Sequence, residues 1–188
     1  AATKEHVVEK ADVFVSYAWG YTWDQLLSAI EEAGHGDKHV WLDAFVVNQH
    51  HALDKELDDW LRTFKTGVEE IGHVVVVLAP WDKPIYVKRA WCVFETLAAL
   101  DARVKREVVF PPSEREKLVA VMRTDQFGHS TLMQIFGDVN VARCEAANAV
   151  DRDAILALIG KRTDVNDAVM GPLKAFYRDV MVDAVSKM

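Results

Sequence analysis

The sequence has little cysteine, no excess of positive charge and no long apolar run. Its 188 residues include only two cysteines, Cys92 and Cys144, which lie in different segments. Neither a disulfide framework nor a cysteine zinc site is therefore supported. The net charge is −7, whereas a general binder of nucleic acid or anionic membranes needs basic stripes that are missing here. We therefore expect no nucleic-acid partner.

Targeting and membrane signals are also missing. No apolar run reaches the length of a membrane span, and the amino-terminal residues lack the basic-then-apolar pattern of a signal peptide. We therefore expect a cytoplasmic protein with no membrane partner. Because the chain begins with Ala1 rather than Met, we expect a piece cut from a longer protein or a processed chain.

Several common active-site motifs are absent as well. No predicted strand is followed by a Walker pattern or by G-x-G-x-x-G, which argues against nucleotide triphosphatases and dehydrogenases. Ser16 lacks the G-x-S-x-G setting of a hydrolase nucleophile. His50 and His51, with Asp54, form a weak metal motif, because adjacent residues on one loop rarely make a site without further ligands. We expect no metal.

What the sequence does contain is an alternation of strands and helices. With 51% hydrophobic and 27% charged residues, the length suits one globular domain over residues 1–188. Short apolar runs predict strands at 12–17, 39–45, 73–79, 106–110 and 138–143. Helical spacing of apolar residues predicts a first helix that begins at Thr22 and ends before Gly34. Further helices are predicted at 57–71, at 90–100, from Ser113 onward, at 154–159 and at 169–185.

This alternation predicts an α/β fold with a flavodoxin-like, five-stranded parallel sheet in the order 2-1-3-4-5 and helices on both faces. In that order the topological switch point, where the strand order reverses, lies between the first and third strands. Ligands of such sheets bind beyond the carboxyl ends of these two strands. The loops at that place are 16–20 and 80–84, and each contains a tryptophan, Trp19 and Trp81.

Glu95 is the anomaly of the sequence. It lies in an almost wholly apolar helix, on the same face as Trp91, and an unpaired buried charge there would cost several kcal/mol. Pairing with Arg89 or Arg103 is the structural alternative. A role in a crevice requires the helix to begin near Lys88, because a start at Pro84 would place Glu95 about three turns down.

Three segments together resemble a Toll/interleukin-1 receptor (TIR) domain, most closely the divergent TIR-like domains of microbial eukaryotes. They are Ser16-Tyr-Ala-Trp19, Phe45-Val-Val-Asn-Gln-His50 and Arg89-Ala-Trp-Cys-Val-Phe-Glu95. The match covers roughly the first hundred residues. The region from about residue 111 onward matches the family poorly, and the chain lacks the basic residue that often follows the first strand's Ser-aromatic pair.

The resemblance implies an NAD⁺ glycohydrolase or cyclase in a signalling or defence context, with Glu95 as the catalytic residue. It also implies a loop after the second strand, 46–55, that gates the pocket and takes part in homo-oligomers through TIR–TIR contacts. NAD⁺ would be the substrate, with no separate cofactor. We expect the substrate to be bound by Ser16, Tyr17, Trp19, Asp43, Phe45, Trp81 and Trp91.

Two other functions stay open. A TIR-like domain can act as a signalling module that works by self-association alone, with Glu95 merely inherited. A different flavodoxin-like binder of nucleosides, such as a deoxyribosyltransferase-like enzyme, also relies on a glutamate. For Cys92 we expect a small buried side chain, because no histidine partner is placed beside it.

Overall fold

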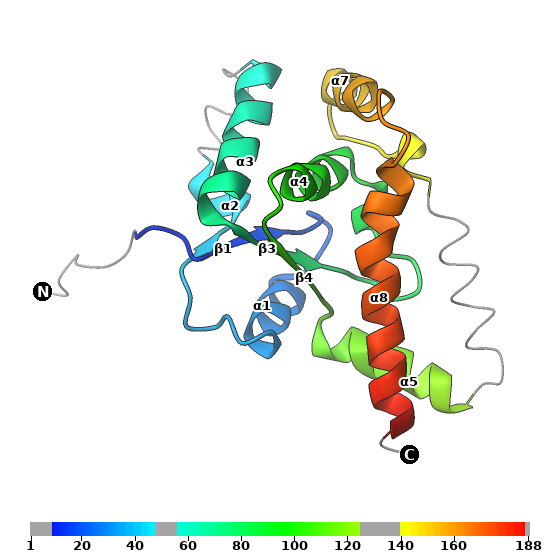
Figure 1. The fold of residues 1–188 in the computed structure, drawn as a ribbon. Helices are drawn as coiled ribbons and strands as arrows, with labels where there is room; N and C mark the ends of the chain where they lie inside the picture. The colour runs from blue at the N-terminus through cyan, green and yellow to red at the C-terminus, as the bar shows by residue number, and fades with distance from the viewer. Residues whose placement is uncertain (1–8, 48–55, 125–139, 187–188) are drawn as a thin grey trace, which may run out of the picture.

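A parallel sheet forms the centre of the computed structural model, which describes residues 9–47, 56–124 and 140–186 (Figure 1). Its strands are β2 (Val40–Trp41), β1 (Val13–Ser16), β3 (His73–Val77) and β4 (Lys105–Val109), in that spatial order. Every neighbouring pair is parallel. The mixed α/β class is therefore confirmed, and so is the predicted order of the first four strands.

Helices cover both faces of this sheet, because its central strands are apolar on both sides. Val75 and Val77 of β3 pack with α1 (Trp23–Glu32), whereas Val74 and Val76 belong to the larger cluster that contains α3 (Leu57–Ile71) and α4 (Ala90–Asp101). Figure 1 shows α1 on one side of the sheet and α3 and α4 on the other. An unbroken run of buried valines is typical of a parallel strand covered twice.

The ends of α1 and α3 follow the sequence signals. The Thr22 side chain accepts a hydrogen bond from the backbone of Gln25, whose own side chain bonds the backbone N–H of Thr22, forming a capping box. Gly72 ends α3 with a φ of 75°, in the left-handed region that favours glycine. The helix start predicted at Thr22 and the helix predicted at 57–71 are both confirmed.

The second strand is shorter than the predicted range 39–45. After Trp41 the chain turns into a short helix, α2 (Asp43–Val46). The carboxylate of Asp43 accepts a hydrogen bond from the backbone N–H of Ala44 at 2.7 Å, and such local bonds compete with strand pairing. The loop predicted at 46–55 lies mostly outside the described residues.

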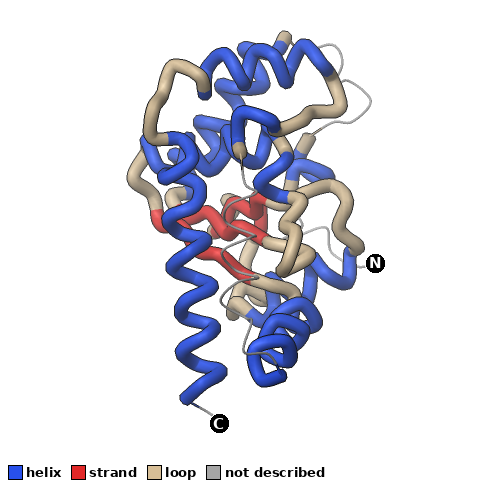
Figure 2. Tube along the Cα trace, turned by 90° about the vertical axis from the view of Figure 1, so that its right-hand side faces the viewer, coloured by secondary structure: helices blue, strands red, loops and turns tan. Residues whose placement is uncertain are grey.

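The predicted fifth strand at 138–143 is wrong over the part that the structure describes. Asn140 accepts a bond from the backbone of Ala142 and caps a 3₁₀ helix, η3 (Val141–Arg143); residues 138 and 139 lie outside the described ranges. The sheet has four strands within those ranges. The long helix α8 (Val165–Ser186) packs at the β4 end instead, with the ring of Phe110 at 4.7 Å from Phe176 (Figures 1 and 2).

The carboxy-terminal half is helical, as expected, but its boundaries differ. Helix α5 (Pro112–Thr124) begins before Ser113, so that serine lies inside the helix rather than at its cap. Helix α7 (Ala149–Ile159) begins earlier than the predicted residue 154, and α8 begins at Val165, earlier than the predicted residue 169. Among the described helices, none combines the length and the apolar composition that crossing a membrane requires.

Helices α5 and α8 hold the loop that follows β3 from two sides. The backbone N–H of Trp81 donates to Oε2 of Glu114 at 2.9 Å, and the hydroxyl of Tyr177 donates to the carbonyl of Trp81. Glu114 is only 2% exposed, and its other oxygen accepts a bond from Lys117. The loop 80–84 is thereby fixed against the carboxy-terminal helices.

Replacing Glu114 by alanine should lower the free energy of unfolding by about 1–3 kcal/mol, because the buried N–H of Trp81 loses its acceptor. Chemical denaturation followed by circular dichroism measures the change. The matched control is Glu116→Ala, an exposed side chain on the same helix, which should change stability by less than about 0.5 kcal/mol. Equal losses in the two variants would contradict the clamp.

Candidate functional site

The start of α4 decides where Glu95 lies. A 3₁₀ turn, η2 (Tyr86–Lys88), comes first, Arg89 has extended backbone angles, and the helix begins at Ala90. This is the late start that a role in the crevice requires. Glu95 therefore lies in the second turn of α4, at the carboxyl end of β1.

Ser16, the last residue of β1, holds the Glu95 carboxyl group. Its hydroxyl donates to Oε2 of Glu95, and both side chains are buried, at 1% and 7% exposure. The Ser16 oxygen also lies 2.7 Å from the hydroxyl of Tyr86, which lies 2.9 Å from the hydroxyl of Thr96. Thr96 donates in turn to the carbonyl of Cys92. A chain of buried hydroxyl groups thus joins Glu95 to the backbone of its own helix.

Burial controls the charge of Glu95. Desolvation raises its pKa to about 8, while the hydrogen bond from Ser16 lowers it and the nearby Asp43 carboxylate raises it. Within the described part of the chain, neither Arg89 nor Arg103 forms an ion pair with Glu95, so the structural alternative of an arginine partner is not realised. The carboxyl group is mostly protonated at neutral pH.

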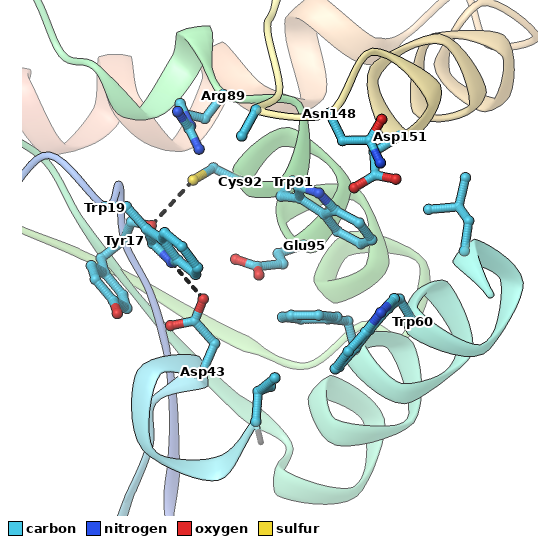
Figure 3. Close-up of a pocket in the computed structure, with 14 residues that line it drawn as sticks. Tyr17, Trp19, Asp43, Trp60, Arg89, Trp91, Cys92, Glu95, Asn148 and Asp151 are labelled. Atoms are coloured by element: carbon cyan, nitrogen blue, oxygen red, sulfur yellow. Dashed lines mark hydrogen bonds between the residues drawn. The ribbon is translucent and has the colours of Figure 1, made fainter. Parts of the chain in front are cut away.

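Glu95 points into a pocket of about 350 Å³ at the carboxyl edge of the sheet (Figure 3). Its aromatic wall comes from the loop after β1, from α3 and from α4, and consists of Tyr17, Trp19, Trp60, Phe64 and Trp91. The polar side chains that line it are Asp43, Arg89, Cys92, Glu95, Asn148 and Asp151. An apolar pocket with a few convergent polar groups and a perturbed carboxyl is typical of a ligand site.

Five of the eight sequence-predicted site residues line this pocket, namely Glu95, Tyr17, Trp19, Asp43 and Trp91. Ser16 lies beneath its floor and contacts Glu95. Asp43 also positions the aromatic side: its carboxylate accepts a bond from the Trp19 indole N–H at 2.6 Å. The phenol of Tyr17 has a raised pKa because of burial and the adjacent Asp43.

Trp81 and Phe45 do not belong to the pocket. Trp81 is 8% exposed and packs in the core, because α5 and α8 close over its loop. Phe45 is 72% exposed and stacks on Trp23, with 5.3 Å between the ring centroids. The prediction that the two would contact a ligand rested on their nearness to strand ends in the sequence.

Sequence reasoning missed several lining residues. Trp60 and Phe64 lie in the helix predicted at 57–71, for which the sequence predicts no site residue. Their i, i+4 spacing puts both on the face that meets Trp91, and the Phe64 and Trp91 rings lie 5.2 Å apart. Asn148 and Asp151 come from the start of α7, in the region without a predicted role. No pattern in the sequence points to that pair.

Arg89 is the missed residue with the clearest signal. The sequence offers Arg89 as an ion-pair partner of Glu95, yet its side chain lines the pocket on the side away from Asp43 (Figure 3). Its position just before Ala90, where α4 begins, directs it to the carboxyl edge of the sheet. The pocket lining thus combines one arginine with three carboxyl groups, those of Asp43, Glu95 and Asp151.

Cys92 is a buried thiol, as predicted. Its S–H donates to the carbonyl of Tyr17 at 3.3 Å, and burial raises its pKa well above the ordinary value. A thiol held in its protonated form is a poor nucleophile. His50 and His51 lie outside the described residues.

Comparison of the chain with protein-family models, curated proteins and solved structures finds no match.

The buried carboxyl makes stability depend on pH. In the unfolded chain Glu95 ionises near pH 4.5, but in the folded chain near 8. Between these values the folded state holds one more proton, so wild type should lose about 1.4 kcal/mol of stability per pH unit as the pH rises, and level off above about 8. Glu95→Gln, which cannot ionise, should lack this loss.

Denaturant titrations at pH 5.5, 7 and 8.5 measure the difference between wild type and Glu95→Gln. The advantage of the variant should grow with pH over this range. Glu116→Gln, which changes an exposed carboxylate of α5, serves as the control. A constant offset between wild type and Glu95→Gln would show that the carboxyl is already ionised at pH 5.5.

Proposed function

We propose that this chain is a TIR-type NAD⁺ glycohydrolase or cyclase in which Glu95 is the catalytic residue. The observation that carries the proposal is a single buried carboxyl group at the floor of an aromatic pocket, beyond the carboxyl ends of β1 and β3. The proposal includes the finer fold: the four described strands would belong to a flavodoxin-like sheet of TIR type, with α8 at the place of the fifth strand.

The pocket suits the cationic nicotinamide ring. Trp60 and Trp91 line it with flat aromatic faces, and Trp19 lies across from them beside Asp43. Aromatic faces attract a cation within about 6 Å of the ring centre. With Glu95 protonated, the other two carboxyl groups of the lining, Asp43 and Asp151, still outnumber the single guanidinium of Arg89, so a cationic heterocycle is favoured over a neutral one.

One carboxyl group suffices for this chemistry. The bond between nicotinamide and ribose C1′ breaks with its electron pair going to the ring nitrogen, so nicotinamide leaves neutral and needs no acid. A water oxygen then forms the new bond to C1′ and loses a proton, giving ADP-ribose; attack by the adenine gives the cyclic product. Ionised Glu95 would stabilise the positive charge that develops on the ribose and accept bonds from its hydroxyl groups.

The raised pKa of Glu95 is compatible with this role. In the empty pocket the carboxyl is mostly protonated at pH 7, because its pKa is about 8. A cation bound a few ångströms away favours the ionised form and lowers that pKa. Binding of NAD⁺ would therefore release the proton and create the carboxylate that the reaction needs.

Glu95→Gln should abolish nicotinamide release, because an amide cannot supply the negative charge. In wild type, kcat/KM should rise about tenfold per pH unit up to about pH 8 and then level off, since this ratio reports the ionisation of the free enzyme. Nicotinamide release from concentrated protein, measured from pH 5.5 to 9, tests both statements. Glu116→Gln is the control and should behave as wild type.

Three results would redirect the proposal. Release that persists in Glu95→Gln would show that another residue carries the reaction. If wild type releases nicotinamide only at the background rate, even on a crowding support that promotes assembly, the enzymatic function is ruled out. Cleavage of a neutral deoxyribonucleoside in place of NAD⁺ would favour the deoxyribosyltransferase-like alternative.

Arg89 should bind the phosphates of the dinucleotide. Replacing it by alanine removes a charge-assisted hydrogen bond, so kcat/KM for NAD⁺ should fall by about tenfold to a hundredfold, mainly through KM. Nicotinamide riboside, which has no phosphate, should be cleaved equally by wild type and Arg89→Ala. An equal loss on both substrates would place the arginine at the ribose or in the structure of the pocket.

A second candidate function, self-association without catalysis, rests on a different observation. Four large apolar side chains are at least half exposed near the pocket mouth, and two of them stack on each other; they are Trp19, Trp23, Phe45 and Val46. Contiguous exposed aromatic residues often mark a protein interface. If nicotinamide release is absent, light scattering of wild type against Phe45→Ser decides whether this patch joins copies of the chain.

A further inference from the structure

A second cluster of chemically competent side chains lies on the other side of the molecule from Glu95. His35 follows α1, His73 is the first residue of β3, and Glu107 lies in β4. The Nε2 atoms of the two histidines lie 3.1 and 3.2 Å from the same oxygen of Glu107, Oε2. The proposed reaction at Glu95 uses none of these residues.

The sheet register brings the cluster together. In the parallel pairing of β3 and β4, His73 lies opposite Lys105 and Val75 opposite Glu107. Because side chains alternate along a strand, His73 and Glu107 project from the same face of the sheet, the face that α1 covers through Val75. Their side chains are only 15% and 30% exposed.

His35 is held in place by the end of α1. Gly34 adopts a positive φ of 77°, and the backbone N–H of His35 donates to the carbonyl of Ile30 at 3.0 Å. This is the Schellman arrangement, which fixes the two residues after a helix. The imidazole is 12% exposed and lies edge-on to that of His73, with 5.2 Å between the ring centroids.

We propose that His35, His73 and Glu107 form a binding site for a divalent transition-metal ion of the zinc class. The three donor atoms lie within 4.8 Å of one another. Around a tetrahedral zinc with bonds of about 2.0–2.2 Å, neighbouring donor atoms lie about 3.3–3.5 Å apart. Both nitrogen-to-oxygen distances need to open by only a few tenths of an ångström to admit the ion.

The donor set also indicates the kind of cation. Two imidazole nitrogens and one carboxylate oxygen suit zinc and its neighbours, whereas calcium and magnesium prefer oxygen donors alone. Lys105 lies 3.6 Å from the same carboxylate oxygen, but its side chain is 65% exposed and can turn to solvent when the ion binds. A water molecule would complete the coordination.

The site would act as a staple rather than as a second active centre. It joins three segments that are far apart in the sequence, the loop after α1, the start of β3 and the middle of β4. His73 opens β3, at the amino edge of the sheet, whereas Ser16 and Glu95 lie at the carboxyl edge. Metal binding should therefore raise the thermal stability of the chain without requiring NAD⁺.

Cobalt(II) titration of the metal-free full chain tests the proposal. We expect one equivalent to bind, with the intense visible absorption of a tetrahedral site, and zinc to displace it. Glu107→Gln, which keeps the hydrogen bonds of the cluster but is a poor ligand, should weaken binding by about tenfold or more. His35→Gln should do the same, while circular dichroism confirms that each variant is folded.

Two control variants separate this cluster from other histidines. His39→Ala removes an exposed histidine outside the cluster, and a joint His50→Ala and His51→Ala variant removes the adjacent pair; both should keep the cobalt spectrum and the thermal shift. Absence of saturable binding to wild type overturns the proposal. So does binding that Glu107→Gln leaves unchanged, or that is lost with His50 and His51.

Discussion

The burial of one carboxyl group against the end of β1 determines the rest of the site. Glu95 can stay inside the protein only in its neutral form or beside a compensating partner, because an isolated charge there is strongly disfavoured. Ser16 supplies one hydrogen bond, and the hydroxyls of Tyr86 and Thr96 support the serine. The space that remains open in front of Glu95 is the pocket.

How much of this follows from the sequence depends on the range of the interactions involved. The valine run of β3 and the glutamate in an apolar helix are local signals in the sequence. The strand order follows from the alternation of strands and helices. Together they predict Glu95 at the carboxyl edge of the sheet, where the structure has it in contact with Ser16. The predicted strand at 39–45 is already wrong at Asp43 for a local reason. The Asp43 side chain accepts a hydrogen bond from the next backbone N–H, and this bond favours a short helix over a strand.

Long-range packing accounts for the other errors. Trp81 follows β3 in a proline-rich loop, which is typical of an exposed tip, but Glu114 and Tyr177 bind its backbone from helices far along the chain. The β4 end of the sheet packs against α8 through Phe110 and Phe176, contacts that no spacing in the sequence indicates. Asn148 lines the pocket for the same reason, because its position depends on how α7 packs against α4.

The two edges of the sheet carry carboxyl groups in different protonation states. At the carboxyl edge, Glu95 is buried and carries a proton, so the empty pocket holds little charge at its floor. At the amino edge, burial raises the pKa of Glu107, but the neighbouring imidazoles and Lys105 outweigh it and lower that pKa, so the carboxylate is ionised. One sheet thus presents a protonated carboxyl group at its carboxyl edge and, at its amino edge, a carboxylate that lies beside two imidazoles.

The neutral state of Glu95 also bears on ligand selection, if the proposed function holds. A neutral ring, such as the dihydronicotinamide of NADH, meets a protonated carboxyl and gains only an ordinary hydrogen bond. A cationic ring replaces the proton and gains a charge–charge contact inside a poorly solvated pocket, where such contacts are strong. Desolvation alone would exclude any charged ligand, so the pocket needs both its aromatic walls and a carboxyl that can give up its proton. In the proposed enzyme, that combination would favour the oxidised dinucleotide over the reduced one.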